Sequence, residues 1–254
     1  MAIPNPMIKG PGLLYVQSRI ERQDVLDEET FFKWYDEDHI SEIVDTPGMK
    51  SAFRYRAVDF EERNKKKEKP YLAFYPMQDM AFTQGDEFRN IKVKSPLLPE
   101  TGIIYDLAEM DVRYLSLVQK TEPMDNTNSP SSCLVVFGIE PGPDVSDEEA
   151  EKWFKEEHIP RAGALEGYIR TTFYHLQYAR TNAQSRALKG LPTTDAPAPE
   201  PPTFLALHEF GGVVDFPTEL DSTPNAQKML RGAKQVERVV YRLAKGLGTQ
   251  WFFN

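Results

Sequence analysis

One stretch of the sequence occurs twice, and this repeat constrains the fold more than any other feature does. Residues 26–48 (LDEETFFKWYDEDHISEIVDTPG) align without a gap on residues 145–167 (VSDEEAEKWFKEEHIPRAGALEG). Both copies keep a tryptophan, a histidine and a glycine at matching places, namely Trp34, His39 and Gly48 in the first copy and Trp153, His158 and Gly167 in the second. Matching positions over such a length indicate an internal duplication. We therefore expect two similar structural units in the chain.

The composition is that of a globular protein and argues against several kinds of partner. The chain of 254 residues is 40% hydrophobic and 27% charged, which is enough for two modest domains with cores of their own. Its net charge of −9 argues against nucleic acid, because a phosphate backbone attracts concentrated positive charge. The only cysteine is Cys133, so no internal disulfide is expected. No segment approaches the ~20 apolar residues of a membrane span, so we expect a cytoplasmic protein with no membrane partner.

Each repeat is the start of a longer pattern of strands and helices. In the first half, strands are expected at residues 13–20, 49–59, 71–75 and 111–120, with helices beginning at Asp27 and spanning 82–91. In the second half, strands are expected at 132–139, 168–178, 204–208 and 236–244, with helices beginning at Ser146 and spanning 224–233. The order β-α-β-β-α-β in both halves predicts two tandem ferredoxin-like units of the α+β class. Each such unit has a sheet with both helices on one face.

The boundaries between these units follow from polar and proline-rich segments. We expect an N-terminal repeat over residues 1–122, a linker over 123–131 and a C-terminal repeat over 132–254. A polar hinge is predicted at 60–70, and a proline-rich insertion at 179–202 is predicted to be extended or mobile. Pro160 is expected to end the second helix early, since proline lacks a backbone donor. The bare sheet face of each unit needs a partner, which the other unit can supply by packing sheet to sheet.

The motif strings WYDEDHI…TPG and WFKEEHIP…EGY, set in this layout, resemble the dimeric α/β-barrel superfamily and within it the EthD-like proteins. The resemblance implies that two ferredoxin-like units close one barrel with their helices outside. It also implies that a single chain carrying both units closes its own barrel, which leaves further homo-oligomer formation open. The superfamily includes cofactor-free monooxygenases, polyketide cyclases, decarboxylases, lactone isomerases and haem enzymes, so the resemblance implies a fold more firmly than a reaction.

Two of the four histidines, His39 and His158, occupy equivalent places on the inward side of the repeated helix. A histidine in a pocket between helix and sheet is suited to general acid/base catalysis near neutral pH. The alternative is that each histidine hydrogen-bonds a backbone carbonyl and shapes the turn that follows, and its presence in both copies favours this alternative.

Six further residues are candidates for contacting a hydrophobic substrate: Phe32, Tyr35, Tyr55, Phe154, Tyr174 and His208. Aromatic residues at helical spacing belong to a core more often than to a binding site, and they include Tyr35, Phe154, Trp34 and Trp153. Strand alternation places Arg54 and Arg56 on the face opposite Tyr55, so these three residues are not expected to line one cavity.

The two histidines are expected to differ in their surroundings. The helix offers Phe31, Phe32 and Tyr35 around His39, where the matching positions around His158 are Ala150, Glu151 and Phe154. We expect the first pocket to be more enclosed and apolar, so that burial keeps His39 neutral at pH 7. His39 is therefore predicted to be the working acid/base and His158 to be mainly structural.

No cofactor or metal is expected from the sequence. The repeated helices lack the histidine pairs of a metal site, and the glycine-rich phosphate cradle and the nucleophile-elbow motif are absent. Together with the resemblance, this predicts a metal- and nucleotide-independent enzyme that acts on a hydrophobic aromatic or polyketide-like molecule by decarboxylation, cyclisation, isomerisation or cofactor-free oxygenation. The alternatives are a non-catalytic small-molecule-binding or stress-related barrel, and a haem protein in which a histidine ligates iron.

Overall fold

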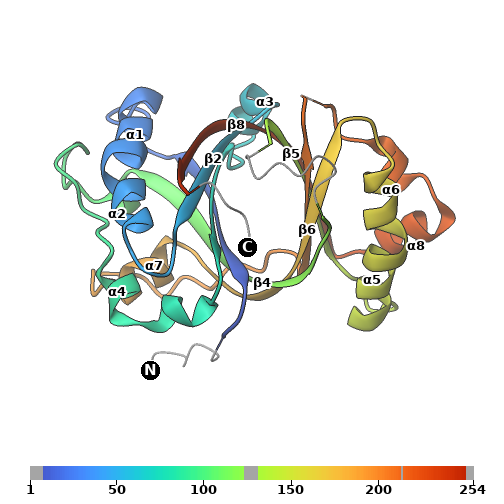
Figure 1. Cartoon of the computed structure of the whole chain (residues 1–254). Helices are drawn as coiled ribbons and strands as arrows, with labels where there is room; N and C mark the ends of the chain where they lie inside the picture. The colour runs from blue at the N-terminus through green and yellow to red at the C-terminus, as the bar shows by residue number, and fades with distance from the viewer. Residues whose placement is uncertain (1–7, 123–130, 213, 250–254) are drawn as a thin grey trace.

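The fold is one closed barrel of eight antiparallel strands with helices on the outside (Figure 1). The computed structural model describes residues 8–122, 131–212 and 214–249. The strands are β1 Gly12–Ile20, β2 Ser51–Ala57, β3 Tyr71–Met77, β4 Ala108–Lys120, β5 Cys133–Glu140, β6 Tyr168–Arg180, β7 Phe204–Phe210 and β8 Gln235–Gly248. The predicted strands are all present. Most of the predicted linker, residues 123–130, lies outside the described residues.

The barrel consists of two four-stranded sheets joined at their edges. The first half has the order β4-β1-β3-β2 and the second has the order β8-β5-β7-β6, which is the same ferredoxin-like order twice. Hydrogen bonds between β2 and β8 and between β4 and β6 connect the halves. Both sheets thereby lose their open edges, which would otherwise expose unpaired backbone groups. The predicted fold class is confirmed, and edge pairing is what brings the two inner faces together.

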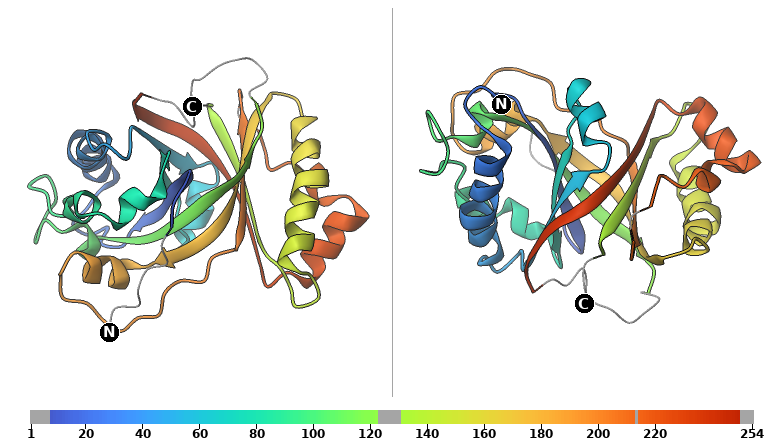
Figure 2. Two further views of the ribbon diagram at one scale, coloured as in Figure 1. Left: turned by 60° about the horizontal axis from the view of Figure 1, so that its bottom comes forward. Right: turned by 90° about the horizontal axis from the view of Figure 1, so that it is seen from above.

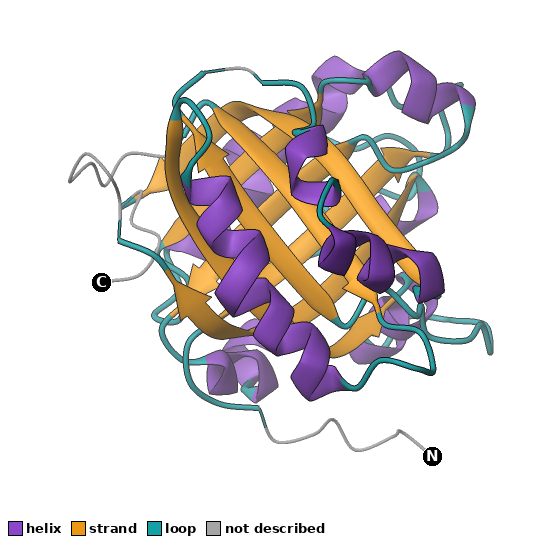
Figure 3. Ribbon diagram, turned by 90° about the vertical axis from the view of Figure 1, so that its right-hand side faces the viewer, coloured by secondary structure: helices purple, strands orange, loops and turns teal. Residues whose placement is uncertain are grey.

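Helices from both halves of the chain lie on the outside of the barrel (Figure 1). The α-helices of the first half are α1 Glu28–Trp34, α2 Ile40–Val44, α3 Phe60–Lys65 and α4 Asp86–Asn90, with η2 Met80–Gln84 and η3 Ile104–Asp106 as 3-10 turns. Those of the second half are α5 Asp147–Trp153, α6 Ile159–Gly163, α7 Asn182–Leu188 and α8 Pro224–Gly232, with the 3-10 turn η5 Thr218–Asp221. Seen from above, the barrel lies between α1 and α2 on one side and α5, α6 and α8 on the other (Figure 2). The helix formed by α5 and α6 lies beside α8 across the outer face of the barrel (Figure 3).

Each repeated helix contains a single π-helical turn that the sequence pattern did not predict. The turns are η1 Tyr35–His39 and η4 Phe154–His158, and each connects two α-helical segments. The backbone N–H of Ile40 donates to the carbonyl of Tyr35 in the first copy, five residues back rather than four. Such turns are rare and occur often at functional sites. Here the π turn ends at the repeated histidine in both copies.

The expectation that Pro160 ends the second helix is wrong, because α6 continues to Gly163. Pro160 is the second residue of α6 and lies two residues after the π turn ends, where the regular pattern of α-helical hydrogen bonds is already interrupted. A missing backbone donor costs little at such a position, since proline is tolerated in the first turn of a helical segment.

The segment predicted as a loop at 179–202 is partly regular. Its first two residues end β6, and Asn182–Leu188 forms α7, which begins with a capping box made by Thr181 and Gln184. The predicted hinge at 60–70 likewise contains α3. Proline content decided the prediction for the insertion and polar content decided the prediction for the hinge, although the prolines of both segments fall outside the helical parts. Residues 192–202 have no regular secondary structure, in agreement with the prediction for the proline-rich part.

The insertion packs against the first half of the chain, although it belongs to the second. The side-chain amide of Asn182 donates to the carbonyls of Tyr105 and Ala108 at 3.1 and 2.8 Å. Arg186 forms an ion pair with Asp106. In Figure 1, α7 accordingly lies beside α4, on the side of the barrel that carries the first repeated helix.

The barrel interior is apolar in the middle and polar toward its ends. Tyr15, Tyr55 and Tyr174 belong to the buried cluster inside the barrel. Toward one end, Arg113 on β4 of the first half donates to Glu237 on β8 of the second half at 2.6 Å, and both side chains are at most 10% exposed. The two halves are thus joined by a buried ion pair as well as by strand pairing.

Replacing Glu237 by leucine should destabilise the barrel, because it leaves the Arg113 guanidinium buried without its charge partner. We expect the free energy of unfolding in urea to fall by about 3–5 kcal/mol. The matched control is Glu62→Leu, which breaks an exposed pair with Lys65 and should cost less than about 1 kcal/mol. The double variant Arg113→Met/Glu237→Leu should recover part of the loss, and equal instability of the double and single variants would contradict this account.

Candidate active site

An apolar cavity of about 70 Å³ lies between the first repeated helix and the outer face of the barrel. Its walls come from the first helix, β1, β3, β4, the segment around α4 and the insertion. The lining residues are Leu14, Val16, Tyr35, His39, Ile43, Met49, Tyr75, Phe88, Ile91, Val93, Tyr105, Met110, Val112, Arg180, Leu188 and Lys189. The cavity therefore contains one titratable histidine, two cationic side chains and no carboxylate.

His39 is held in this cavity by the π turn and by aromatic neighbours. Its ring stacks on Trp34 with centroids 4.7 Å apart and planes 18° apart, and it meets Tyr35 edge-on at 5.8 Å. The π turn itself is held to β2 because Arg54 donates twice to Asp36, at 3.1 and 3.0 Å. Both anchors restrict the imidazole to one orientation toward the cavity.

The His39 ring is neutral at pH 7. Burial and, to a smaller extent, the nearby Lys189 charge lower its pKa to about 4, while an interaction with the backbone of Lys92 opposes both effects. The Nδ1 atom is buried and has no hydrogen-bond partner among the described residues. The expectation of a neutral His39 agrees with these surroundings, and the backbone contact expected under the structural alternative is also present.

His158 lies in a filled and more deeply buried environment. Its residue is completely inaccessible, and its ring packs against Phe137, Trp153 and Phe154 at centroid distances of 4.4, 4.9 and 5.1 Å. The expectation that His39 would have the more enclosed surroundings is wrong, since part of the His39 residue is exposed. That expectation compared helix positions alone, whereas Phe137 comes from strand β5.

A chain of hydrogen bonds leads from His158 into the second half. His158 Nε2 lies 3.1 Å from His208 Nε2, and His208 Nδ1 lies 2.8 Å from the Thr171 hydroxyl. Tyr168 donates to that hydroxyl at 2.9 Å and exchanges a further hydrogen bond with Thr121 at 2.8 Å. Burial lowers the pKa of His208 to about 3 and the pKa of His158 well below its ordinary value. Two neutral, hydrogen-bonded rings in a packed interior are typical of residues with a structural role.

The structure divides the predicted substrate-binding residues among three places. Tyr35 lines the His39 cavity, whereas Phe154 and His208 pack around His158. Tyr55 and Tyr174 lie inside the barrel, on the sheet face that does not meet the helices. Phe32 lies beneath Arg54, whose guanidinium carbon is 4.0 Å from the ring centroid, and it does not line the cavity. Arg54 is on the face opposite Tyr55, as alternation predicts.

Three cavity residues that sequence reasoning missed come from the insertion and its flanks: Arg180, Leu188 and Lys189. Lys189 donates to the carbonyls of Phe88, Arg89 and Ile91 at 3.1, 2.8 and 2.7 Å, so it ties the insertion to the end of α4. No local signal places these residues near His39, because they lie roughly 140 to 150 positions away in the sequence.

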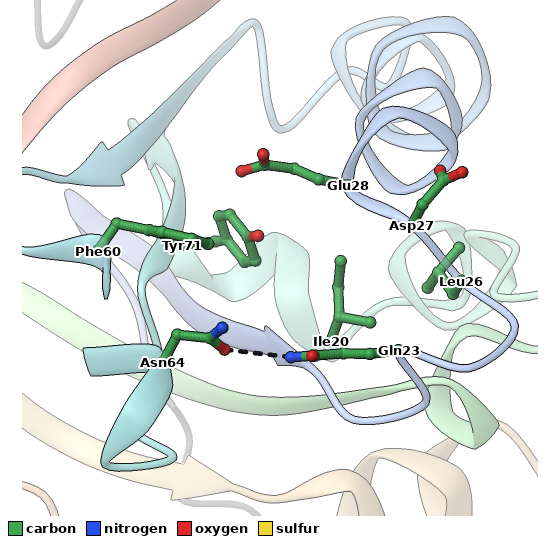
Figure 4. A pocket seen from close by; sticks show the side chains of 8 residues that line it. All are labelled: Ile20, Gln23, Leu26, Asp27, Glu28, Phe60, Asn64 and Tyr71. Carbon is green, nitrogen blue, oxygen red and sulfur yellow. Dashed lines mark hydrogen bonds between the residues drawn. The ribbon is translucent and has the colours of Figure 1, made fainter. Parts of the chain in front are cut away.

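A second hollow, of about 210 Å³, lies between the start of α1 and α3 (Figure 4). Glu28 and Tyr71 line it, and a hydrogen bond of 3.1 Å between the amides of Gln23 and Asn64 crosses one edge. It is larger than the His39 cavity but is open and contains none of the histidines. We therefore place the candidate active site at His39.

Other kinds of site find no support in the part of the chain that the structure describes. Within residues 8–122, 131–212 and 214–249, no three His, Cys, Asp or Glu side chains gather as metal ligands would. Over the same residues, none of the helices is both long and apolar enough to cross a membrane.

Comparison with solved structures identifies the architecture. An anthrone oxidase-like protein matches with a TM-score of 0.55 at 11% identity, covering 96% of this chain and 95% of that one. A putative monooxygenase from Fusobacterium nucleatum matches with a TM-score of 0.52 at 14% identity, covering 94% of this chain and 95% of that one. The chain has the dimeric α/β-barrel fold. No protein-family model and no curated protein matches the sequence. For this dimeric α/β barrel, such low identities establish the fold alone, and the narrower EthD-like resemblance stays a prediction.

The buried histidine pair should make the protein sensitive to acid. Because the folded-state pKa of His208 is about 3 and its ordinary value is 6.5, the unfolded chain binds more protons between these pH values. The free energy of unfolding should therefore fall as pH is lowered through this window, by up to about 1.4 kcal/mol per pH unit for each such histidine. Urea unfolding at several pH values should show a shallower slope for His208→Asn than for the unsubstituted protein. Equal slopes would contradict the assignment.

Proposed function

We propose that the His39 cavity is the active site of an enzyme that acts on a hydrophobic, aromatic or polyketide-like small molecule without a metal or nucleotide. The observation that carries the proposal is a neutral imidazole with an unpartnered, buried Nδ1 in an apolar cavity that also holds two cationic side chains. A neutral imidazole beside cations is suited to taking a proton from a substrate whose conjugate base is an enolate or phenolate.

The low pKa of His39 limits the kind of substrate that it serves. At pH 7, placing a proton on a group with a pKa of about 4 costs about 4 kcal/mol if nothing else changes. An anion formed next to the ring offsets that cost, because an opposite charge within a few ångströms favours the charged imidazole. The site is therefore suited to a substrate that becomes anionic and remains bound when it loses a proton, as in cyclisation, isomerisation or oxygenation of a carbanion. In decarboxylation the anion forms by loss of carbon dioxide instead, and the carbanion then takes up a proton.

The cavity must open before it accepts an aromatic ring. Its volume of about 70 Å³ is smaller than the roughly 150 Å³ cavity that holds benzene in a protein core. Leu188 and Lys189 close one wall and lie just before the irregular residues 192–202 of the insertion, so displacement of this segment is the simplest way to admit a substrate. Haem is far larger than this cavity, and the residues around His39 do not fit it in this arrangement.

The names of the structural neighbours support an enzyme that acts on a small molecule, but they do not indicate which reaction it catalyses. One neighbour is called an anthrone oxidase-like protein and the other a putative monooxygenase. Anthrone is consequently a reasonable first probe, since it is a fused aromatic ketone that forms an enolate by losing a proton.

The decisive comparison is His39→Ala against His158→Ala in turnover of anthrone, followed by product analysis and dioxygen consumption. We expect His39→Ala to lower turnover at least a hundredfold, in the range of general-base contributions. We expect His158→Ala to lose stability by about 2–4 kcal/mol through its cavity and yet to keep turnover below its unfolding temperature. Circular dichroism serves as the folding control. Full turnover by His39→Ala, or its loss in folded His158→Ala, would show that the assignment is wrong.

The pH profile provides an independent check on the same proposal. Since neutral His39 is the active form, kcat/KM should stay level as pH falls from 7 and should decline near pH 4 rather than near pH 6.5. Binding of anthrone without turnover would instead favour the non-catalytic alternative. A Soret band in freshly purified protein would favour the haem alternative.

A further inference from the structure

Arg180, at the end of β6, is an arginine whose charge has no counterpart in the described structure. Its residue is 8% exposed, and it lines the same cavity as His39. One terminal nitrogen, Nη2, donates to the hydroxyl of Tyr114. The remaining two nitrogens, Nε and Nη1, are buried and have no hydrogen-bond partner among residues 8–122, 131–212 and 214–249.

The other buried arginines of the described residues differ from Arg180 in the partners of their guanidinium groups. Within the described residues three more arginines are buried, and each donates to a carboxylate: Arg54 to Asp36, Arg113 to Glu237 and Arg170 to Glu209. Arg180 is the exception, since no carboxylate belongs to its cavity. Its guanidinium carbon lies 4.9 Å from the centroid of the Tyr114 ring, which compensates for only part of the lost hydration.

An arginine does not escape burial by losing its proton, because it stays charged at any ordinary pH. The free N–H groups of a buried guanidinium therefore create a place where an anion is strongly favoured. Lys189 contributes a second positive charge to the cavity, but its amine is already engaged by three backbone carbonyls. Arg180 is accordingly the cavity residue with free donors for an anionic oxygen.

We propose that Arg180 binds the anionic oxygen group of the substrate in the His39 cavity, so that the substrate is an apolar molecule bearing a carboxylate or an acidic hydroxyl group. This inference rests on the proposed function and names its substrate class. A planar guanidinium recognises carboxylate and phenolate oxygens through directed N–H donors, which an ammonium group does not match. The anion fills the place that an aspartate or glutamate takes beside the other buried arginines.

The position of Arg180 also makes the site a composite of both halves. His39 belongs to the first repeat, whereas Arg180 ends the extended second strand of the other repeat and continues into the insertion through Thr181 and α7. The pairing of β4 with β6 places Arg180 opposite Val112, a cavity residue of the first half. The first half therefore supplies the proton acceptor, and the second half supplies the anion-binding group.

The test compares binding of benzoate with binding of its neutral analogue benzamide to the full-length protein, by calorimetry or ligand-observed NMR. We expect benzoate to bind the unsubstituted protein at least tenfold more tightly, and we expect Arg180→Gln to remove that preference. Arg231→Gln, an exposed arginine on α8 with the same change of charge, is the matched control and should keep the preference. A preference that Arg180→Gln retains would overturn the proposal.

A second arm distinguishes the two kinds of anionic oxygen. The absorption spectrum of 4-nitrophenol reports its ionisation, so a phenolate site should lower the pKa of the bound probe in the unsubstituted protein and not in Arg180→Gln. A lowered pKa of bound 4-nitrophenol without a preference for benzoate assigns the site to acidic hydroxyl groups. A preference for benzoate without a lowered nitrophenol pKa assigns it to carboxylates. Absence of both effects rejects the proposal, even where Arg180→Gln fails to fold, because the wild-type measurements stand alone.

These outcomes are separable from those of the proposed function. Benzoate binding that depends on Arg180 should survive in His39→Ala, because the anion contacts the guanidinium and not the imidazole. If turnover proves independent of His39 while benzoate binding still requires Arg180, the catalytic assignment fails and the anion site remains. If turnover requires His39 and neither the benzoate preference nor the nitrophenol shift is found, the substrate class is wrong and the proposed function remains.

Discussion

The pairing of edge strands between the two halves is the interaction on which the rest of the structure depends. Each ferredoxin-like sheet has one covered face, one bare face and two open edges. Joining β2 to β8 and β4 to β6 closes both edges and buries the bare faces against each other. The buried cluster that includes Tyr15, Tyr55 and Tyr174 lies inside this barrel. The cavity that contains His39 lies outside it, beneath the helices.

Barrel closure also explains why the two equivalent helices face such different surroundings. A duplicated unit begins with two equivalent helix-to-sheet interfaces, each with a histidine at the end of a π turn. In the second half, Phe137 and His208 fill the space around His158, and the two rings form a neutral, hydrogen-bonded pair. In the first half a cavity remains beside His39, and a segment of the opposite half covers it. The helix-to-sheet interface around His158 is thus filled core, while the interface around His39 retains a cavity.

Electrostatics distinguishes the remaining cavity from the rest of the interior. Elsewhere, buried charges come in pairs, as with Arg113 and Glu237 inside the barrel. The His39 cavity is instead lined by two cationic side chains and by no carboxylate. An unpaired buried charge is costly for stability. Retaining one in a cavity beside a titratable ring is typical of a site where function has been favoured over stability.

The sequence alone determined the duplication, the order of strands and helices, the fold class, the N-caps Asp27 and Ser146 and the placement of Arg54 opposite Tyr55. These features depend on local periodicity and on a repeat in register, both of which can be read along the chain. Only the tertiary structure decided that Tyr55 and Tyr174 face the barrel interior, that His158 is the more deeply buried histidine, and that Arg180 and Lys189 reach the His39 cavity. The physical reason is that closing the barrel joins strands and loops more than a hundred residues apart, and the composition of a proline-rich insertion contains no information about the surface on which it packs.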